Sequence, residues 1–391
     1  MTSSPQLIGW AHTPFGRSLA PDVEALMSEV ASAAVADAGL SADDIEYITV
    51  GVFGSGFSQQ TFEAALVGSA TPELAKTAAI RTENACATGS AALFTALDAV
   101  QSGRARVALV IGAEKMTAVS SAEAGAVLLG GCHLLSEAVY GSFPGIFAEL
   151  TRRYAERYGD PRQALAQIAA KNHRNGVDNP YAHVRKDLGV EFCSVASDRN
   201  PVVTDPLLRT DCSMISDGAA ALIVAAPDVA RTARRSVGWL GRAQANDHMA
   251  IDARADALEF DGARRAFRTA MAQAGTELSD LGLLETHDCF TAAELLQYEA
   301  FGLAEPGKGA AVLAEGTTQR DGALPVNVSG GLKAKGHPIG ATGVSQHVMA
   351  AMQLVGEAGA MQLPRIDRAA VFNMGGAAVA NYASVLEATK R

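Results

Sequence analysis

The chain has 391 residues, of which 48% are hydrophobic and 19% charged, a size that accommodates two or three packed domains. Its 32 Lys and Arg against 42 Asp and Glu leave a net charge of −10, which argues against a general nucleic-acid binder. No apolar run is long enough for a membrane span, and the first residues lack the basic and apolar regions of an export signal. We therefore expect a soluble, cytoplasmic protein.

In chain order, the elements indicate an internal duplication. A helix that stops at Gly39 is followed by an apolar strand, and the same pattern recurs 236 residues later at Gly275. A second pair of segments repeats the order of strand, glycine-bearing loop, helix and strand. The elements of that pair are expected at 78–82, 91–101 and 107–112 in the first half, and at 324–328, 344–355 and 370–373 in the second.

Each half therefore alternates strands and helices, which predicts an α/β fold with buried, largely parallel strands. We expect a first half of residues 1–117 plus 208–235 and a second half of residues 236–391. Residues 118–207 break the pattern and are expected to form an inserted loop domain.

The insertion contains an unusually basic stretch. Residues 151–186 hold eight Arg or Lys and three acidic residues, a net of +5 in an acidic protein. Arg152, Arg153 and Arg157 open this stretch and are candidates for binding phosphate groups, for which arginine and lysine are the preferred side chains. A solvated helix face is the alternative interpretation.

Two candidate reactive groups lie in corresponding loops of the two halves. Cys86, in ENACATGS, is expected where a strand turns into a helix, a position whose dipole favours the thiolate. His337, in SGGLKAKGHPIGATG, lies in the matching loop of the second half, among glycines that permit close backbone approach. The five cysteines include no CxxC pair, so a metal site of the usual zinc spacing is not expected.

Cys289 and His287 lie in THDCF, just past the predicted strand LGLLE. The following segment predicts a helix that begins with Thr291 as its cap and Glu294 three residues on. Near the C-terminus, NMGGAAVANYASVLE predicts two strands joined by a glycine turn, whose Gly375 N–H could face a substrate oxyanion. A simple hairpin turn is the alternative there.

At these residues the chain resembles the thiolase superfamily, and within it the sterol-carrier-protein type, over essentially its whole length. The most specific matches are HDCF at 287–290 and GGLKAKGHPIGATG at 330–343, with CSMISDGAAALIV at 212–224 as a weaker one. Common thiolases carry a second catalytic cysteine in a C-x-G motif near the C-terminus. Here that motif reads Asn373-Met374-Gly375, and Cys289 is the thiol that the sterol-carrier type uses instead.

The resemblance implies two βαβαβαββ halves packed in five αβαβα layers with an inserted loop domain. It implies reversible thiolysis of a 3-ketoacyl-CoA, or the reverse Claisen condensation of two acyl-CoA molecules. Cys86 would carry the acyl group, His337 would take its proton, Cys289 would be the acid/base at Cα, and His287 would support an oxyanion site. The backbone N–H groups of Cys86 and Gly375 would form a second oxyanion hole.

The same resemblance sets the expected ligands. Acyl-CoA and CoA are substrates, no other cofactor is implied, and Ser213 and Gly336 from the matched motifs join the three arginines as candidate CoA contacts. A homodimer is expected, and a small OB-fold partner subunit is an option. Three other functions stay open: a decarboxylating ketoacyl synthase, a retro-aldolase subunit acting on steroid side chains, and an inert scaffold subunit. Retention of both cysteines and both histidines argues against the last two.

Overall fold

The computed structural model describes residues 4–54, 56–364 and 366–391, and one nine-stranded sheet runs through it in the order β3-β2-β4-β7-β1-β8-β11-β10-β9. Strands β1 and β8 join the sheets of the two halves edge to edge through Gln6–Gly238 and Leu7–Val237. The first half supplies β1 (Gln6–His12), β2 (Tyr47–Gly51), β3 (Ala78–Thr82), β4 (Val107–Lys115) and β7 (Asp217–Ala225). The second half supplies β8 (Ser236–Asn246), β9 (Leu283–Glu285), β10 (Arg368–Gly375) and β11 (Ala380–Lys390).

The strand order confirms the duplication. Read outward from β1 and from β8, the two halves run β1-β7-β4-β2-β3 and β8-β11-β10-β9, and an isolated parallel bridge from Leu284 to Val326 stands where a fifth strand of the second half would lie. The corresponding strands of the two halves therefore follow one another in the same spatial order.

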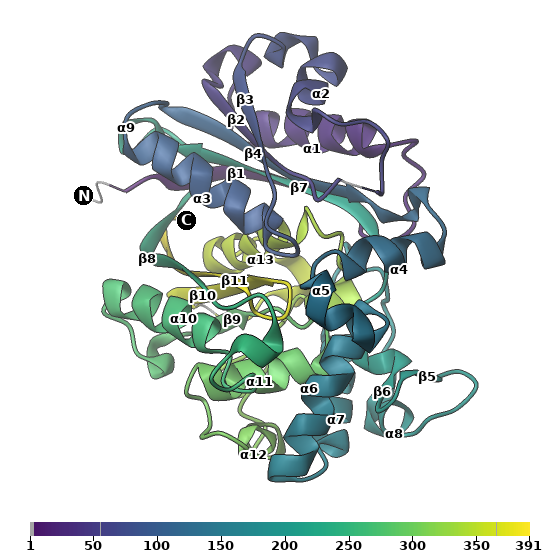
Figure 1. Ribbon diagram of the computed structural model, residues 1–391. Helices are drawn as coiled ribbons and strands as arrows, with labels where there is room; N and C mark the ends of the chain where they lie inside the picture. The colour runs from purple at the N-terminus through teal and green to yellow at the C-terminus, as the bar shows by residue number, and fades with distance from the viewer. Residues whose placement is uncertain (1–3, 55, 365) are drawn as a thin grey trace.

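Five layers alternate helix and sheet (Figure 1). The outer helices of the first half are α1 (Val23–Asp37) and α2 (Glu63–Ala70), and those of the second are α10 (Asp261–Ala274), α11 (Thr291–Ala300) and α12 (Gly309–Ala314). Helices α3 (Thr88–Gln101) and α13 (Thr342–Val355) form the middle layer, between the part of the sheet from the first half and the part from the second half. Both are buried on nearly all sides, because each contacts a sheet as well as the other helix.

The expectation of largely parallel strands was wrong. Only β2–β3, β2–β4 and β9–β10 pair in parallel, and the other ladders of the described residues are antiparallel. The four residues between β10 and β11 are too few for a crossover, so these strands must run in opposite directions. The high content of apolar residues in these strands predicted correctly that the strands are buried, but it did not distinguish parallel from antiparallel pairing.

The helix-stop glycines are confirmed. Gly39 follows α1 with φ of +70° and Gly275 follows α10 with φ of +54°, and a methyl group at either would meet no atom within 4 Å. Only backbone strain therefore opposes a side chain at these positions.

Gly275→Ala is therefore expected to lower the free energy of unfolding by about 1 kcal/mol, the cost of a left-handed conformation for an L-residue. Gly125→Ala is the matched control, because Gly125 lies inside the helix Ser121–Leu129 with nothing within 4 Å and has no positive φ. There the same substitution is expected to raise stability by about 0.5–1 kcal/mol. Urea unfolding measures whether each substitution lowers or raises the free energy of unfolding. Equal changes in the two variants would contradict the assignment of Gly275 as a left-handed helix stop.

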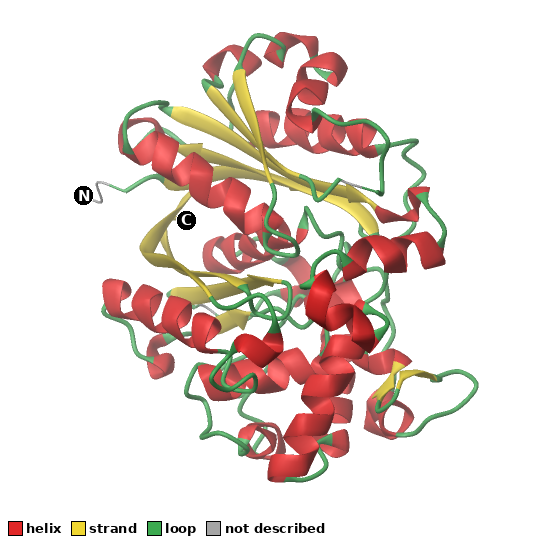
Figure 2. Cartoon of the chain, viewed as in Figure 1, coloured by secondary structure: helices red, strands yellow, loops and turns green. Residues whose placement is uncertain are grey.

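Between β4 and β7 lies a largely helical segment that contacts the lower half of the molecule in Figure 2. It contains α4 (Ser121–Leu129), α5 (Leu134–Glu137), α6 (Phe143–Tyr158), α7 (Arg162–Gly176), α8 (Gly189–Ser194), β5 (Val202–Thr204) and β6 (Leu207–Leu208). Its helix α7 packs on α11 and on a turn of π-helix at Gly331–Lys335. The limits of the three domains stay predictions.

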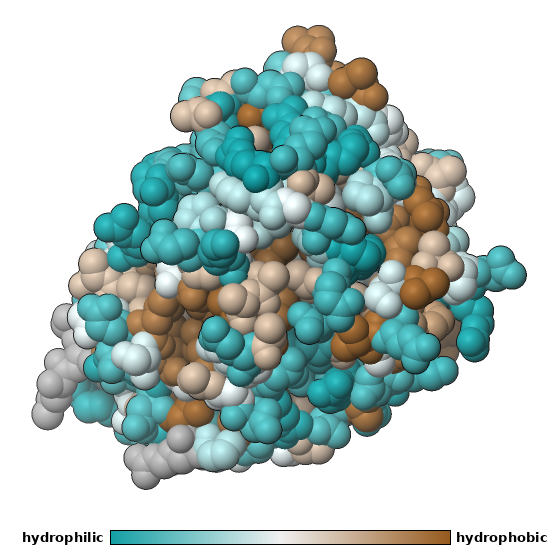
Figure 3. All heavy atoms as spheres, turned by 90° about the horizontal axis from the view of Figure 1, so that it is seen from below, coloured by the Kyte–Doolittle hydropathy of each residue, from teal (hydrophilic) through white to brown (hydrophobic). Residues whose placement is uncertain are grey.

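None of the described helices is both long and apolar enough to cross a membrane. Figure 3 shows one face of the molecule, where hydrophilic residues cover most of the surface and hydrophobic residues gather in smaller areas.

Candidate active site

The two central helices meet at their N-termini, and this contact brings the two halves together at one point. A methyl group at Gly89 would lie 2.8 Å from the Gly340 oxygen, and one at Gly343 would lie 2.3 Å from the Ser90 nitrogen. Both positions therefore require glycine. The loops that precede α3 and α13 consequently converge, and they carry Cys86 and His337.

Cys86 lies in a tight turn between β3 and α3. The Ala87 N–H donates to the Asn84 oxygen over 3.1 Å, the Thr88 N–H donates to the Ala85 oxygen over 3.0 Å, and Ala85 itself has φ of +49°. A left-handed alanine costs about 1 kcal/mol, a strain that is common beside reactive residues. The turn holds Cys86 at the helix start, as expected, with the side chain buried.

His287 and His337 lie beside Cys86. One ligand atom from each of the three residues, the Cys86 Sγ and a ring nitrogen of each histidine, lies within 4.8 Å of the others. The two imidazole rings are 5.1 Å apart between centroids and nearly perpendicular. The Nε2 atoms of both histidines are buried and have no hydrogen-bond partner. Three groups that the sequence singled out in separate motifs thus face one small space.

Hydrogen bonds favour one tautomer of His337. Its Nδ1 lies 2.6 Å from the Thr342 hydroxyl, and that hydroxyl lies 2.9 Å from the Pro338 carbonyl, to which it can donate its one proton. In that arrangement the hydroxyl accepts from an Nδ1–H. The Nε2 of His337 is then left with a lone pair, so this imidazole can act as a base toward the space that it shares with Cys86.

Burial dominates the protonation of the site. It lowers the pKa of His337 to about 3, with a contribution from Lys335, and it lowers the pKa of His287 well below the usual value. Burial raises the pKa of Cys86 to about 12, although the N–H groups of Gly376 and Cys86 oppose the rise. The helix start was expected to favour the thiolate, but desolvation outweighs it, so the free protein holds a neutral thiol between neutral imidazoles.

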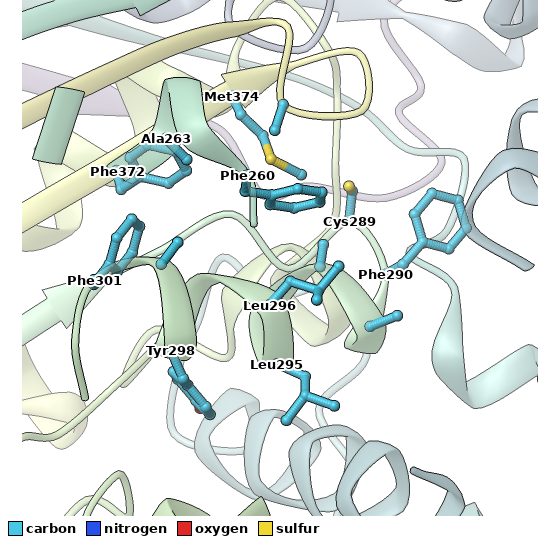
Figure 4. Packing of buried hydrophobic residues seen from close by; sticks show 14 of the residues in the cluster. Phe260, Ala263, Cys289, Phe290, Leu295, Leu296, Tyr298, Phe301, Phe372 and Met374 are labelled. Atoms are coloured by element: carbon cyan, nitrogen blue, oxygen red, sulfur yellow. The ribbon is translucent and has the colours of Figure 1, made fainter. Parts of the chain in front are cut away.

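Cys289 approaches the same region from the second half. Strand β9 ends at Glu285, so His287 and Cys289 lie in the loop before α11 rather than on an extended strand. Figure 4 shows the Cys289 sulfur directed away from α11 and toward Met374. Burial raises the pKa of Cys289 well above the usual value, and the nearby Cys86 adds to this. The thiol of Cys289 is therefore neutral too.

The cap of α11 was predicted wrongly. Phe290 occupies the N-cap position without a side-chain cap, and Thr291 donates to Asp211 over 2.9 Å instead. Glu294 does not cap either, because it pairs with Lys171 at 2.8 Å in the buried contact between α11 and α7. A tertiary partner for each side chain replaces the local capping bond.

Gly375 and Gly376 form the turn that covers Cys86. A methyl group at Gly375 would lie 2.2 Å from the Asn84 oxygen, so only glycine permits this approach. A cavity of about 410 Å³ reaches this turn from outside, and its lining residues are Phe53, Arg81, Glu83, Asn84, Ala85, Gly130, Gly131, Met249, Gly375, Gly376, Val379 and Ala380. The cavity ends beside the residues that flank Cys86.

The three predicted phosphate contacts are already paired with acidic groups. Arg152 bonds Glu149 at 3.1 Å, Arg153 bonds Asp252 at 2.6 Å, and Arg157 pairs with Asp256. These arginines stay 30–47% exposed, so their role in binding CoA stays a prediction.

The two other predicted CoA contacts differ in surroundings. The Ser213 N–H donates to the Cys289 oxygen over 2.8 Å, which places Ser213 beside the site. Gly336 is buried, and a methyl group there would lie 2.9 Å from the Ser216 Oγ and 3.1 Å from the Phe15 Cβ.

Sequence reasoning missed three residues that hold the site together. Thr342 orients His337, and Asp288 accepts from the backbone N–H groups of Leu332 at 2.6 Å and Lys333 at 3.1 Å, which fixes the loop before His337. Asn373 lies between His287 and Cys86. The sequence did contain one signal for Thr342, because the tripeptide Ala-Thr-Gly occurs at the start of both central helices, at 87–89 and 341–343.

Comparisons with known proteins agree with this architecture. Residues 6–228 match the family model of the thiolase N-terminal domain, and residues 243–388 match the thiolase C-terminal domain-like model. An acetyl-CoA acetyltransferase of Methanothermobacter thermautotrophicus is 35% identical over 95% of this chain and 96% of its own. Sterol carrier protein 2 of Oryctolagus cuniculus is 33% identical over 95% of this chain and 70% of its own.

Two solved structures share the fold. The Ltp2-ChsH2(DUF35) aldolase superposes with a TM-score of 0.84 at 22% identity, covering 100% of this chain and 99% of that one. An acetyl-CoA acetyltransferase from Syntrophomonas wolfei superposes with a TM-score of 0.74 at 18% identity, covering 99% of both chains. The thiolase family models and the acetyl-CoA acetyltransferase relatives indicate that the protein is an acyltransferase. The chain belongs to the thiolase family.

Proposed function

We propose that this protein is a 3-ketoacyl-CoA thiolase or acetyl-CoA acetyltransferase that works through an acyl group on Cys86. The observation that carries the proposal is the buried cluster in which Cys86, His287 and His337 place their reactive atoms within 4.8 Å of one another. A nucleophile beside a base and a further polar donor is the arrangement that acyl transfer needs.

The first step is attack of the Cys86 sulfur on the acyl carbonyl. His337 takes the thiol proton at Nε2, because its Nδ1–H is donated to Thr342. The neutral resting state supports this role, since a base with a bound proton could not accept another. Oxyanion stabilisation is proposed for the backbone N–H groups of Cys86 and Gly375, in the turn where Gly376 also faces the thiol.

The second step is cleavage of the bond between Cα and Cβ of the 3-ketoacyl-CoA. The electron pair of that bond moves to the departing acetyl-CoA enolate, whose Cα takes the thiol proton of Cys289. The raised pKa of Cys289 supports this, because an acid must carry its proton before the step. The Cys289 thiolate then accepts the proton of the incoming CoA thiol, and the CoA sulfur attacks the acyl group on Cys86. The departing Cys86 sulfur takes back the proton that His337 held, which restores both thiols and the neutral imidazole.

The apolar surroundings of Cys86 fit an acyl chain. The thiol packs in a cluster with Phe57, Met116, Ala124 and Ile339. Acetoacetyl-CoA with free CoA tests the activity, since thiolysis lowers the absorbance of the enolate, and longer 3-ketoacyl-CoA substrates then give the chain-length preference. No loss of enolate with any chain length would refute the proposal. The reaction needs no cofactor besides CoA as substrate and product.

The arginines of α6 are proposed to contact CoA phosphates. Changing Arg152, Arg153 and Arg157 together to Gln is expected to raise KM for CoA about tenfold, and to change KM for a pantetheine substrate much less, because pantetheine lacks the nucleotide phosphates. Exposed ion pairs contribute little to stability, so the fold should survive. Arg264 and Arg265, which pair with Asp261 on α10, give a matched control. Equal changes in KM for both substrates would show that the basic stretch is a solvated surface and does not bind the CoA phosphates.

The oligomeric state and the cellular location are proposed from the thiolase family. We propose a cytoplasmic homodimer that pairs along β3, because this edge strand bonds only β2 within the described residues and its Ala78, Ala79 and Ile80 are exposed. A small partner subunit is a further proposal, supported by the aldolase neighbour whose assembly includes ChsH2(DUF35). Light scattering with and without a co-encoded small protein measures both.

A further inference from the structure

Asn373 stands where common thiolases carry their second cysteine, and it contacts both halves of the site. It is fully buried near the end of β10. Its Nδ2 donates to the Cys86 carbonyl oxygen over 3.1 Å and lies 2.9 Å from the Nδ1 of His287. One amide nitrogen therefore bridges the nucleophile turn and an imidazole that come from opposite halves of the chain.

The chemistry of the amide decides which atom of His287 carries the proton. An amide NH2 group offers two hydrogens and no acceptor, so Nδ2 donates one to the Cys86 oxygen and the other to His287. The Nδ1 of His287 must then hold a lone pair. Rotating the amide by 180° would set its oxygen against the Cys86 oxygen, two acceptors in contact, so the observed orientation is the favoured one.

A neutral His287 with a lone pair at Nδ1 carries its proton at Nε2. That Nε2–H is buried, has no partner in the described chain and faces the space beside Cys86. His337 has the opposite tautomer, with its lone pair at Nε2. The two imidazoles thus offer one donor and one acceptor to the same substrate.

We propose that Asn373 is a positioning residue that holds His287 in the Nε2–H tautomer, so that His287 donates to a thioester oxygen and only His337 is left as the base. The inference rests on the proposed acyl transfer for its consequences, but the tautomer itself is a property of the free protein.

A second consequence concerns metal ions. Zinc binds thiolate and imidazole lone pairs, and Cys86, His287 and His337 have the spacing of such a site. To bind, His287 would have to move its proton to Nδ1, where it would meet the NH2 group of Asn373, two donors in contact. Asn373 therefore disfavours metal at the active site, whereas a carboxylate at 373 would accept the Nδ1–H and favour it.

The tautomer can be measured without any substitution at 373. In protein labelled with ¹⁵N-histidine, the nitrogen shifts distinguish protonated from unprotonated ring nitrogens, and His287→Gln and His337→Gln variants assign the two signals. We expect His287 to be protonated at Nε2 and His337 at Nδ1. Protonation of His287 at Nδ1 would overturn the proposal, whether or not the protein proves to be a thiolase.

Asn373→Asp tests the same inference through function. It is expected to lower kcat about 10²-fold with little change in KM, the loss that follows when one oxyanion donor is removed. It is also expected to make Cys86 acylation at least tenfold more sensitive to Zn²⁺, and EDTA should reverse the inhibition. Asn381→Asp is the matched control, because the side-chain amide of buried Asn381 on the next strand donates to the backbone oxygens of Ala245, Ala378 and Val379. Equal Zn²⁺ sensitivity of the wild type and Asn373→Asp would overturn the role of Asn373.

Discussion

Cys86→Ala is expected to abolish acyl transfer, with a fall in kcat of about 10⁴-fold or more, the scale seen when a catalytic nucleophile is removed. The reason is geometric. Cys86 supplies the thiol that His337 can reach, at the start of α3 in a turn held by a left-handed Ala85. Incubation of the wild type with an acyl-CoA should add one acyl mass to the peptide that contains Cys86, and mass spectrometry of that peptide measures it.

The control for this experiment is another buried cysteine. Cys193 lies among Ala166, Ala169 and Ala170, in a cluster separate from that of Cys86. Cys193→Ala should keep its acyl labelling and most of its rate. Intact labelling of the Cys86→Ala protein would show that a different residue carries the acyl group, and Cys289 would then be the first to examine.

The duplicated architecture could be predicted because its signals are local. Helix-stop glycines at matching positions, two glycine-rich loops and two apolar strands recur in each half, and each requires only neighbours in sequence to be recognised. Strand direction could not be predicted in the same way. Whether β4 pairs with β7 in parallel depends on how the chain returns after the insertion, which places about a hundred residues between them.

The sequence predicted which reactive side chains form the site, but it did not predict their protonation states or tautomers. Motifs located Cys86, His287, Cys289 and His337, and the structure brings three of them within 4.8 Å. Their protonation depends on burial, which overrides the effect of the helix start at Cys86. The tautomer of His287 depends on Asn373, which is 86 residues away in sequence, where the motif indicates only that a thiol is missing.

Contacts between residues distant in sequence also limit what can be predicted for the basic stretch of residues 151–186. A local count of charges gave a net of +5 for residues 151–186. The acids that pair with Arg153 and Arg157 lie 99 residues further on, at Asp252 and Asp256, so no local window could include them. Charge counts predict a phosphate site only where distant parts of the chain do not supply the counter-ions.

Cys289→Ala is expected to separate the two halves of the reaction. Acylation of Cys86 by an acyl-CoA needs only Cys86, its base and the oxyanion donors, so that step should proceed near the wild-type rate. Exchange of the acetyl-CoA methyl protons with deuterated solvent should fall at least 10²-fold, because proton transfer at Cα loses its acid/base. Overall thiolysis should fall with it. Mass spectrometry measures the acyl-enzyme, and NMR of the methyl signal measures the exchange.

The alternative is that Cys289 only packs beneath the loop and that His287 is the base. The hydrogen bonds oppose this, because the Asn373 amide leaves His287 with its proton at Nε2 and its lone pair directed away from the site. A thiol is suited to the task, since its ordinary pKa of about 8.5 lies close to neutrality and a bound thioester changes the surroundings that raise it here. Exchange that persists near the wild-type rate in Cys289→Ala would exclude Cys289 and transfer the role to His287. Exchange that is lost in Cys289→Ala but kept in His287→Gln would leave the thiol as the only group at this position able to move the proton.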